Sequence, residues 1–153
     1  MKVEIGLNGE LMRDDIEPQL LLLDYLREDR GLTGAKRSCD TQVCGTCTVL
    51  VDGAPVSACC TLVADADGRE VLTIEGFAVL PDFERFEQAF IDHAALQCGF
   101  CTAGMLLTTK SLLDERRLTS AQSIRQGLAG NLCRCTGYHA IVEAVADIAG
   151  VGP

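Results

Sequence analysis

The first half of the chain has the alternation of apolar and polar residues that is typical of short β-strands. The expected strands cover residues 3–9, 11–16, 47–51, 55–60 and 69–76. The dipeptides Asn8-Gly9 and Asp52-Gly53 separate successive strands, and both are favoured in tight hairpin turns. The pattern therefore predicts two hairpins within a small mixed sheet.

One helix is expected inside this strand-rich half. Residues 19–29 place Leu22, Tyr25 and Leu26 on one helical face, and glycines follow that would end the helix. An apolar face of this kind packs against a sheet, so the helix is expected to cover one side of the strands.

The second half changes to the spacing of amphipathic helices. Four segments carry apolar residues on one helical face: Phe83, Phe86 and Phe90; Met105, Leu112 and Leu113; Ile124 and Leu128; and Ile141, Val145 and Ile148. Asp82, Thr102 and Ser120 are placed to cap the first three helices, and Gly150 can close the last. These features predict a small four-helix bundle.

The two patterns together predict an α+β fold with two domains. We expect a sheet domain over residues 1–76 and a helical domain over residues 77–153. Each domain is near the size at which an apolar core alone is only marginally stabilising. A bound metal centre in each half would supply the stability that the core lacks.

Composition narrows the range of partners. The chain is 48% hydrophobic and 23% charged, which is an ordinary globular composition. Its net charge of −9 argues against nucleic acid and anionic membrane surfaces, because both select basic patches. No apolar run approaches the roughly 20 residues of a membrane span, and the start lacks the apolar core of a secretory signal. We therefore expect a cytoplasmic protein.

The cysteines are the residues that most narrow the range of possible functions. The chain has nine cysteines, an odd number that cannot pair completely, and structural disulfides are rare in a reducing cytosol. Eight of them fall into two sets, so metal ligation explains them better than a disulfide scaffold does.

The first set has the spacing C-x4-C-x2-C at Cys39, Cys44 and Cys47. With a distant fourth cysteine, this spacing is the plant-type [2Fe–2S] pattern. Gly45 lies inside the loop and permits close backbone approach, so amides near it are candidates for tuning a cluster. Structural zinc sites usually combine two close pairs of ligands, and this spacing fits zinc poorly.

Two neighbouring residues compete for the fourth position. A hairpin across Asp52-Gly53 would bring Cys59 and Cys60 back beside the loop. Adjacent residues of a strand point to opposite faces, so only one of the two can face a cluster. The other is expected to pack as a small apolar thiol.

The second set consists of a C-x2-C pair, Cys98 and Cys101, and a C-x-C pair, Cys133 and Cys135. Both pairs lie beside expected helix starts, where the helix dipole favours thiolates. Gly99 allows tight backbone approach and is a second candidate for tuning by amides. On spacing alone, zinc and iron–sulfur both fit this set.

Three motifs then resemble a known family. The segments "CDTQVCGTCTVLVDG", "QCGFC" and "GNLCRCTGY" are similar to the small iron–sulfur subunit of the molybdenum hydroxylases, the group that includes xanthine oxidase, carbon monoxide dehydrogenase and 4-hydroxybenzoyl-CoA reductase. The resemblance runs over nearly the whole chain, and two independent cysteine patterns occur in the right order.

The resemblance implies a plant-ferredoxin-like β-grasp domain followed by a four-helix domain, each with one [2Fe–2S] cluster. It assigns the outer cluster, nearer a flavin, to Cys39, Cys44, Cys47 and Cys59. It assigns the inner cluster, nearer a molybdenum–pterin cofactor, to Cys98, Cys101, Cys133 and Cys135. It also implies that Gln97 hydrogen-bonds the pterin and that Cys135 lies closest to it. The implied partners are a large molybdenum subunit and a medium FAD subunit, in a heterotrimer that is commonly doubled.

Two positions depart from the family pattern. Ala103 stands where the family usually has proline, which would loosen the first helical turn without removing a ligand. Cys60 stands where the family usually has an apolar residue, so the choice between Cys59 and Cys60 stays open.

The sequence itself contains no catalytic constellation. His93 and His139 are the only histidines, and both are expected to be ordinary surface or satisfied side chains. The expected function is electron relay between a substrate site in a large subunit and a flavin or external acceptor. A free-standing two-cluster ferredoxin and a zinc-stabilised interaction module are the alternatives.

Overall fold

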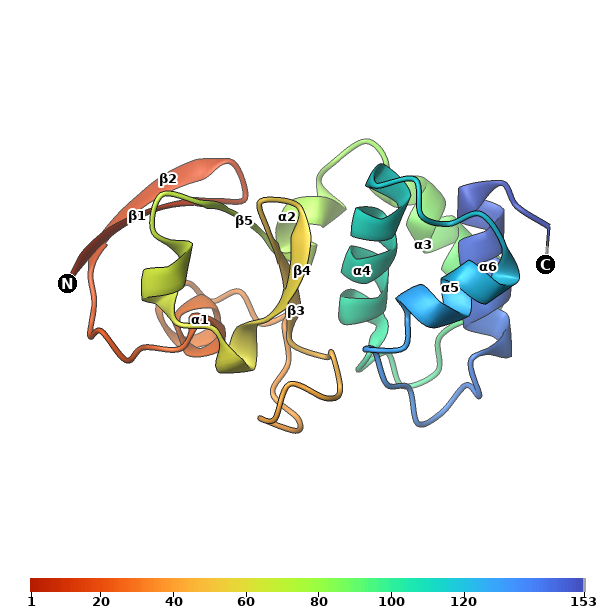
Figure 1. Ribbon diagram of the computed structural model, residues 1–153, viewed down its shortest axis with the longest axis horizontal. Helices are drawn as coiled ribbons and strands as arrows, with labels where there is room; N and C mark the ends of the chain where they lie inside the picture. Colours follow the sequence, from red (N-terminus) through yellow and green to blue (C-terminus); the bar gives the residue numbers. More distant parts are fainter. Residues whose placement is uncertain (153) are drawn as a thin grey trace.

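The chain folds as a sheet half and a helical half that lie side by side along the long axis of the molecule (Figure 1). The structure is a computed structural model, and it describes residues 1–152. The N-terminus lies at the free end of the sheet half, and the chain runs from there into the helical half.

Five strands form one mixed sheet in the order β2-β1-β5-β3-β4. They are β1 (Lys2–Leu7), β2 (Glu10–Asp15), β3 (Thr48–Val51), β4 (Ala54–Ser57) and β5 (Glu70–Leu72). Strand β1 runs parallel to β5, and the other neighbouring pairs are antiparallel. Asn8 and Gly9 have φ of 54° and 86°, and Asp52 and Gly53 have φ of 49° and 81°, as a two-residue hairpin turn requires. Both predicted hairpins are confirmed, and the sheet is that of a β-grasp fold.

The helix expected over residues 19–29 is shorter and wider than a regular α-helix. A single turn, α1 (Leu22–Asp24), continues as a π-helical turn, η1 (Tyr25–Asp29). The amide of Arg30 donates to the carbonyl of Tyr25 at 3.1 Å, which is the longer-range bond that defines a π turn. The wider turn still buries the predicted face, because Leu22, Tyr25 and Leu26 are all 1% exposed or less.

Two segments expected to be strands end in helical turns. The strand expected over residues 55–60 stops at Ser57, and a 3₁₀ turn, η2 (Ala58–Cys60), follows it; a second such turn is η3 (Val63–Ala66). The strand expected over residues 69–76 ends at Leu72, and α2 (Ile74–Ala78) begins two residues later. The expected boundary after residue 76 therefore falls inside α2, and the division at that point stays a prediction.

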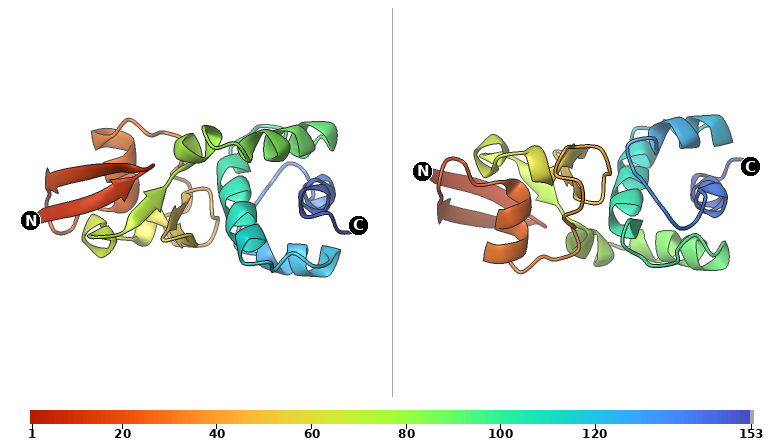
Figure 2. Two further views of the ribbon diagram at one scale, coloured as in Figure 1. Left: turned by 90° about the horizontal axis from the view of Figure 1, so that it is seen from above. Right: turned by 90° about the horizontal axis from the view of Figure 1, so that it is seen from below.

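The four helices expected in the second half are present. They are α3 (Phe83–Asp92), α4 (Thr102–Asp114), α5 (Ala121–Gly127) and α6 (His139–Ala149). Figure 2 shows α3 and α5 on either side of α4, with α6 closing the open side of this arrangement. None of the helices in residues 1–152 has the length and apolarity to cross a membrane.

The predicted helix ends are correct in part. The amide of Ser123 donates to Ser120 Oγ at 3.2 Å, so Ser120 caps α5 as expected, and Gly150 closes α6 with φ of 66°. Asp82 precedes α3 but makes no capping bond with its side chain. The residue before α4 is Cys101, so Thr102 is the first helical residue and the cap predicted there is wrong.

Each half has its own apolar core, and the two cores meet at one strand. The sheet core lies between the strands and the turn formed by α1 and η1. In the helical core, the Phe77 ring packs edge-on against Phe83 and Phe86, with centroids 5.2 Å and 5.0 Å away. Leu50 of β3 is buried in this helical core. The sheet therefore packs directly on the bundle, which fixes the two cysteine sets relative to each other.

Candidate iron–sulfur centres

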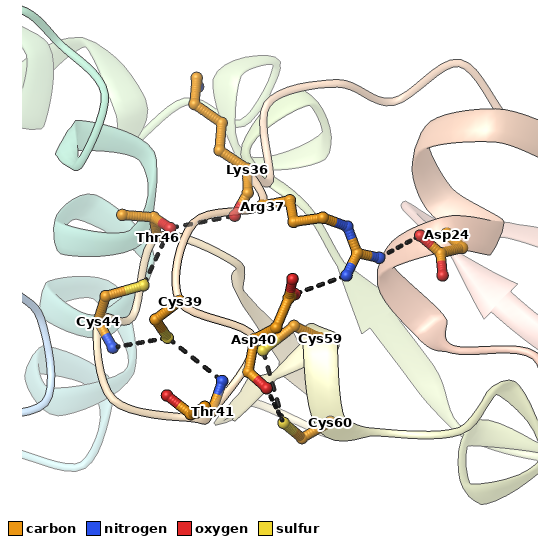
Figure 3. Close-up of polar contacts among 10 residues, drawn as sticks. All are labelled: Asp24, Lys36, Arg37, Cys39, Asp40, Thr41, Cys44, Thr46, Cys59 and Cys60. Atoms are coloured by element: carbon orange, nitrogen blue, oxygen red, sulfur yellow. Dashed lines mark hydrogen bonds and ion pairs between the residues drawn. The ribbon is translucent and has the colours of Figure 1, made fainter.

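The loop from Cys39 to Cys47 turns its amides toward a sulfur atom (Figure 3). The amides of Thr41 and Cys44 donate to Cys39 Sγ at 3.5 Å and 3.4 Å. Hydrogen bonds from the amides of Thr41, Cys44 and Val43 lower the pKa of the Cys39 thiol to about 6. The loop thus prepares a thiolate, which is the form that binds a metal.

The backbone of this loop reaches that shape through left-handed conformations. Asp40, Gln42 and Gly45 have φ of 52°, 59° and 67°. Successive amides in such turns converge on one side and form a concave site for negative charge. This is a physical reason for the crowding of three cysteines into a short loop.

Within the first set the thiols act on one another in two pairs. The Cys44 thiol helps to lower the pKa of Cys39, and after burial the Cys59 thiol helps to raise the pKa of Cys47. Cys47 is buried, and this burial is the main cause that raises the pKa of its thiol to about 12. A buried thiol of this kind becomes a thiolate only with a cation beside it, and a bound iron would provide one.

The structure separates the two candidates for the fourth position. Cys59 is 5% exposed and pairs with Cys47, whereas Cys60 is exposed. Their sulfur atoms are 3.6 Å apart, and Cys60 Sγ lies 3.9 Å from the carbonyl oxygen of Asp40. The expectation that the two point to opposite faces of a strand is wrong, because both lie in the 3₁₀ turn η2.

The second set also forms two pairs. Cys98 Sγ and Cys135 Sγ lie 3.6 Å apart, and after burial the Cys133 thiol also helps to raise the pKa of Cys101. Burial raises the pKa of the Cys101 thiol to about 12. For Cys133, burial acts in the same direction, but hydrogen bonds led by the Thr136 hydroxyl, 3.1 Å away, outweigh it and lower the pKa. The Cys133 thiol therefore loses its proton more readily than the Cys101 thiol does.

Each half supplies four thiols, and this donor set can be tested against the chemistry of the group that the sequence predicts. A structural zinc needs four ligands around one ion, whereas a [2Fe–2S] cluster spreads four thiolates over two irons, two on each. The donor set therefore fits the two-iron cluster in both halves.

A hollow of about 560 Å³ lies between the two sets. Its walls carry Cys44 of the first set and all four cysteines of the second, Cys98, Cys101, Cys133 and Cys135. Exposed Phe100 and Leu132 also line it. The second set is thus more open to the surface than the buried part of the first.

The two sets meet through the backbone. The amide of Leu132 donates to the carbonyl of Cys44 at 2.8 Å, and Asn131 Nδ2 donates to the carbonyl of Gly45 at 3.2 Å. A Cβ added to Gly104 of α4 would lie 2.2 Å from the Gly45 oxygen, so this approach requires glycine there. The sequence does indicate that Gly104, one of the glycines flanking the second set, allows close backbone approach, but sequence reasoning missed Asn131. The only signal for Asn131 was its place beside the C-x-C pair.

The remaining residues predicted for the site lie at the surface of the second set. Gln97 is exposed beside Cys98, and Gly99 has φ of 78° with open space around the position of a Cβ. His93 and His139 stand 3.3 Å from Asp147 and Glu143 respectively. These pairs lie outside both cysteine sets. Gln97 and Gly99 keep their expected roles as predictions.

Two family matches cover the chain. Residues 15–91 match the family described as a 2Fe-2S iron-sulfur cluster binding domain. Residues 73–146 match the [2Fe-2S] binding domain family. The first match contains the Cys39–Cys60 region and the second contains both pairs of the helical half.

Curated relatives match over nearly their whole length. The nicotine 6-hydroxylase small subunit of Paenarthrobacter nicotinovorans is 43% identical over 153 residues, which covers 98% of this chain and 90% of the relative. The nicotinate dehydrogenase small FeS subunit of Eubacterium barkeri is 45% identical over 143 residues, with 94% and 91% covered. The xanthine dehydrogenase iron-sulfur-binding subunit of Escherichia coli O157:H7 is 43% identical over 148 residues, with 95% and 92% covered.

Solved structures agree with the fold. A chain of quinoline 2-oxidoreductase from Pseudomonas putida 86 superposes with a TM-score of 0.90 at 43% identity, covering 98% of this chain and 94% of that one. Aldehyde oxidoreductase from Desulfovibrio gigas superposes with a TM-score of 0.89 at 38% identity, but this chain spans only 17% of that longer chain. The family matches, the relatives and the paired thiols lead to one conclusion: the chain belongs to the small [2Fe–2S] iron–sulfur subunits of the molybdenum hydroxylase family.

Proposed function

We propose that the chain relays electrons through two [2Fe–2S] clusters inside a molybdenum-dependent oxidoreductase. The outer cluster is held by Cys39, Cys44, Cys47 and Cys59, and the inner cluster by Cys98, Cys101, Cys133 and Cys135. When bound, each cluster takes up and releases one electron at a time. This chain supplies the thiolates, the hydrogen bonds to sulfur and the spacing between the two sets.

The observation that carries the proposal is the backbone joint between the two sets. Cys44 accepts a 2.8 Å hydrogen bond from Leu132, and Leu132 is followed directly by Cys133. A ligand of one cluster is therefore one hydrogen bond and one residue from a ligand of the other. A free carrier needs no second centre held in this way, and the relatives are named as subunits.

The hydrogen bonds distinguish the two sets electrostatically. The amides of Thr41 and Cys44 face Cys39 Sγ, and in the second set the Thr136 hydroxyl faces Cys133 Sγ. Hydrogen bonds to ligand sulfur stabilise the more negative, reduced state and so raise its reduction potential. These groups, with the backbone around Gly45 and Gly99, are the features by which this chain would set the reduction potentials of the two clusters relative to each other.

The exposed side of the second set is the proposed contact with a large molybdenum–pterin subunit. Gln97, Cys98 and Cys135 are exposed there, beside the apolar side chains of Phe100 and Leu132. In this proposal Gln97 hydrogen-bonds the pterin and Cys135 is the nearest ligand to it. Substrate chemistry takes place in that partner.

The outer cluster passes electrons to a medium FAD subunit or an external acceptor. We propose a heterotrimer, commonly doubled, in the cytoplasm.

The test is to change Cys101 to serine in the complete enzyme complex. Loss of this partly buried ligand of the inner set should remove one of two electron paramagnetic resonance (EPR) signals and abolish substrate-dependent reduction of the acceptor. Dithionite should still reduce the outer cluster, which shows that the subunit is folded. Unchanged turnover with the physiological acceptor would refute the relay. A colourless wild-type protein that binds zinc without sulfide would refute the clusters themselves.

A further inference from the structure

One thiol near the first set has no role in the proposed clusters. We propose that Cys60 is an alternative ligand of the outer cluster, able to bind the iron that Cys59 holds. This inference rests on the proposed function, because it requires the outer cluster. It concerns a fifth thiol beside a site that needs four.

Distance is the first argument. Cys60 Sγ lies 3.6 Å from Cys59 Sγ, the same separation as between Cys98 Sγ and Cys135 Sγ in the second set. It also lies 3.9 Å from the carbonyl of Asp40, the residue that follows Cys39 in the ligand loop. Figure 3 shows Cys59 and Cys60 next to each other, with both sulfur atoms near Asp40. Cys60 is therefore at the edge of the site and not on its far side.

Local backbone structure is the second argument. In a strand, Cys59 and Cys60 would point to opposite faces, and exchange would require the strand to turn over. In the 3₁₀ turn η2 there are three residues per turn, so adjacent side chains are only about 120° apart around the axis. A rotation of this short turn by that angle would move one sulfur out of a position and the other into it. It would work against the hydrogen bonds that Thr61 Oγ1 and the Ala58 amide donate to the carbonyls of Ser57 and Cys47 at 3.0 Å and 3.4 Å.

The difference in burial between Cys59 and Cys60 indicates which of them binds the cluster in the wild-type protein. Cys59 is 5% exposed and pairs with Cys47, so it is the ligand when both cysteines are present. Cys60 is exposed and loses less packing when it moves. In the exchange, the iron–sulfur bond to Cys59 breaks and one to Cys60 forms. Cys60 gives its proton to water and Cys59 takes one up, so no electron is transferred.

The experiment compares four full-length proteins: wild type, Cys59→Ala, Cys60→Ala and the double variant. Iron and acid-labile sulfide are measured per chain, and the two clusters are followed by EPR. Wild type and Cys60→Ala should contain about four irons, because two clusters hold two each. Cys59→Ala should also keep about four, with a shifted outer signal, and the double variant should keep about two.

The inner cluster signal and circular dichroism report whether each variant is folded. Cys59→Ser, with and without Cys60→Ala, repeats the comparison with a side chain nearer in size to cysteine, in case alanine unfolds the sheet domain. An iron content of Cys59→Ala or Cys59→Ser equal to that of its double variant would overturn the inference. Wild type without iron and sulfide would instead overturn the proposed function.

Discussion

The amide of Leu132 donates a 2.8 Å hydrogen bond to the carbonyl of Cys44, and this bond joins the two halves of the molecule at their cysteine sets. Asn131 reinforces it: its side chain is buried and donates to the carbonyl of Gly45 at 3.2 Å and to Thr48 Oγ1 at 3.5 Å. The joint between the halves is therefore polar and backbone-mediated where the clusters would meet, although it is apolar elsewhere, at Leu50.

Replacing Asn131 with alanine should weaken this joint. The change removes the 3.2 Å hydrogen bond to the Gly45 carbonyl, which keeps Thr48 Oγ1 as a donor at 2.7 Å, so we expect a loss of about 0.5–1.5 kcal/mol, the net contribution of one hydrogen bond. We expect a lower midpoint in denaturant unfolding and slower electron transfer between the clusters after a rapid reduction of the inner one. Gln122→Ala, which shortens an exposed amide on α5, is the control and should leave both unchanged. Equal behaviour of the two variants would show that Asn131 does not hold the joint.

Gly104 allows α4 to approach the first set. Alanine is normally the better helix former by about 1 kcal/mol. Here its Cβ would lie 2.2 Å from the Gly45 oxygen, so we expect Gly104→Ala to destabilise by about 1–3 kcal/mol through overpacking. Thermal unfolding measures the difference. Gly130→Ala is the matched control, because its Cβ meets nothing within 4 Å. A stabilised Gly104→Ala protein would mean that the halves can separate without cost.

The strands, hairpins and four main helices could be predicted because they depend on local patterns. Residues close together in the sequence determine the turns at Asn8-Gly9 and Asp52-Gly53 and the apolar face of α6. The structure of residues 58–60 could not be predicted in this way. The alternation of residues there predicts a strand, but the chain turns at residues 58–60 and brings Cys59 near Cys47. The tertiary contact outweighs the weak local preference for a strand.

In the candidate site, too, the features set by local sequence could be predicted and those set by long-range contacts could not. The spacing of the cysteines predicted the two sets, and the structure brings each set together as two pairs. The contact of Asn131 and Gly104 with Gly45 could not be predicted from the sequence. It joins residues far apart in the chain through the backbone, and no periodicity reports a backbone contact of that kind.

Tyr25 should titrate unusually late. Burial, followed by the hydrogen bond to Asp14 Oδ2 at 2.7 Å, raises its pKa from 10.0 to about 12. Because the folded pKa exceeds the unfolded one, the unfolded chain loses its proton first as pH rises. Tyr25 therefore contributes stability that is complete below about pH 10 and lost as pH rises toward about 12.

Ultraviolet difference titration of the phenol measures this step. Tyr25→Phe should remove it, and Asp14→Asn should lower the pKa of Tyr25, since the carboxylate helps to raise that pKa. The pKa of Asp14 is shifted in the opposite direction, so its contribution to stability depends on pH in the opposite way. Its pKa is lowered, first by the Tyr25 hydrogen bond and also by Arg30, so its contribution is lost as pH falls below its usual value near 3.8. An ionisation of Tyr25 near pH 10 in the folded protein would contradict the buried hydrogen bond.

The Thr136 hydroxyl should tune the second set alone. It lies 3.1 Å from Cys133 Sγ; burial raises the pKa of that thiol, and the hydrogen bonds that together outweigh burial and lower the pKa are led by this hydroxyl. Thr136→Val keeps the shape of the side chain and removes the donor. The reduced inner cluster then loses a hydrogen bond that stabilises its extra charge, so its reduction potential should fall by about tens of millivolts. Redox titration followed by EPR resolves the two clusters, and the outer cluster in the same sample is the control. A shift of both potentials together would mean that the substitution disturbs the joint at Cys44 and Leu132, whereas an unchanged inner potential would remove Thr136 from the tuning of this site.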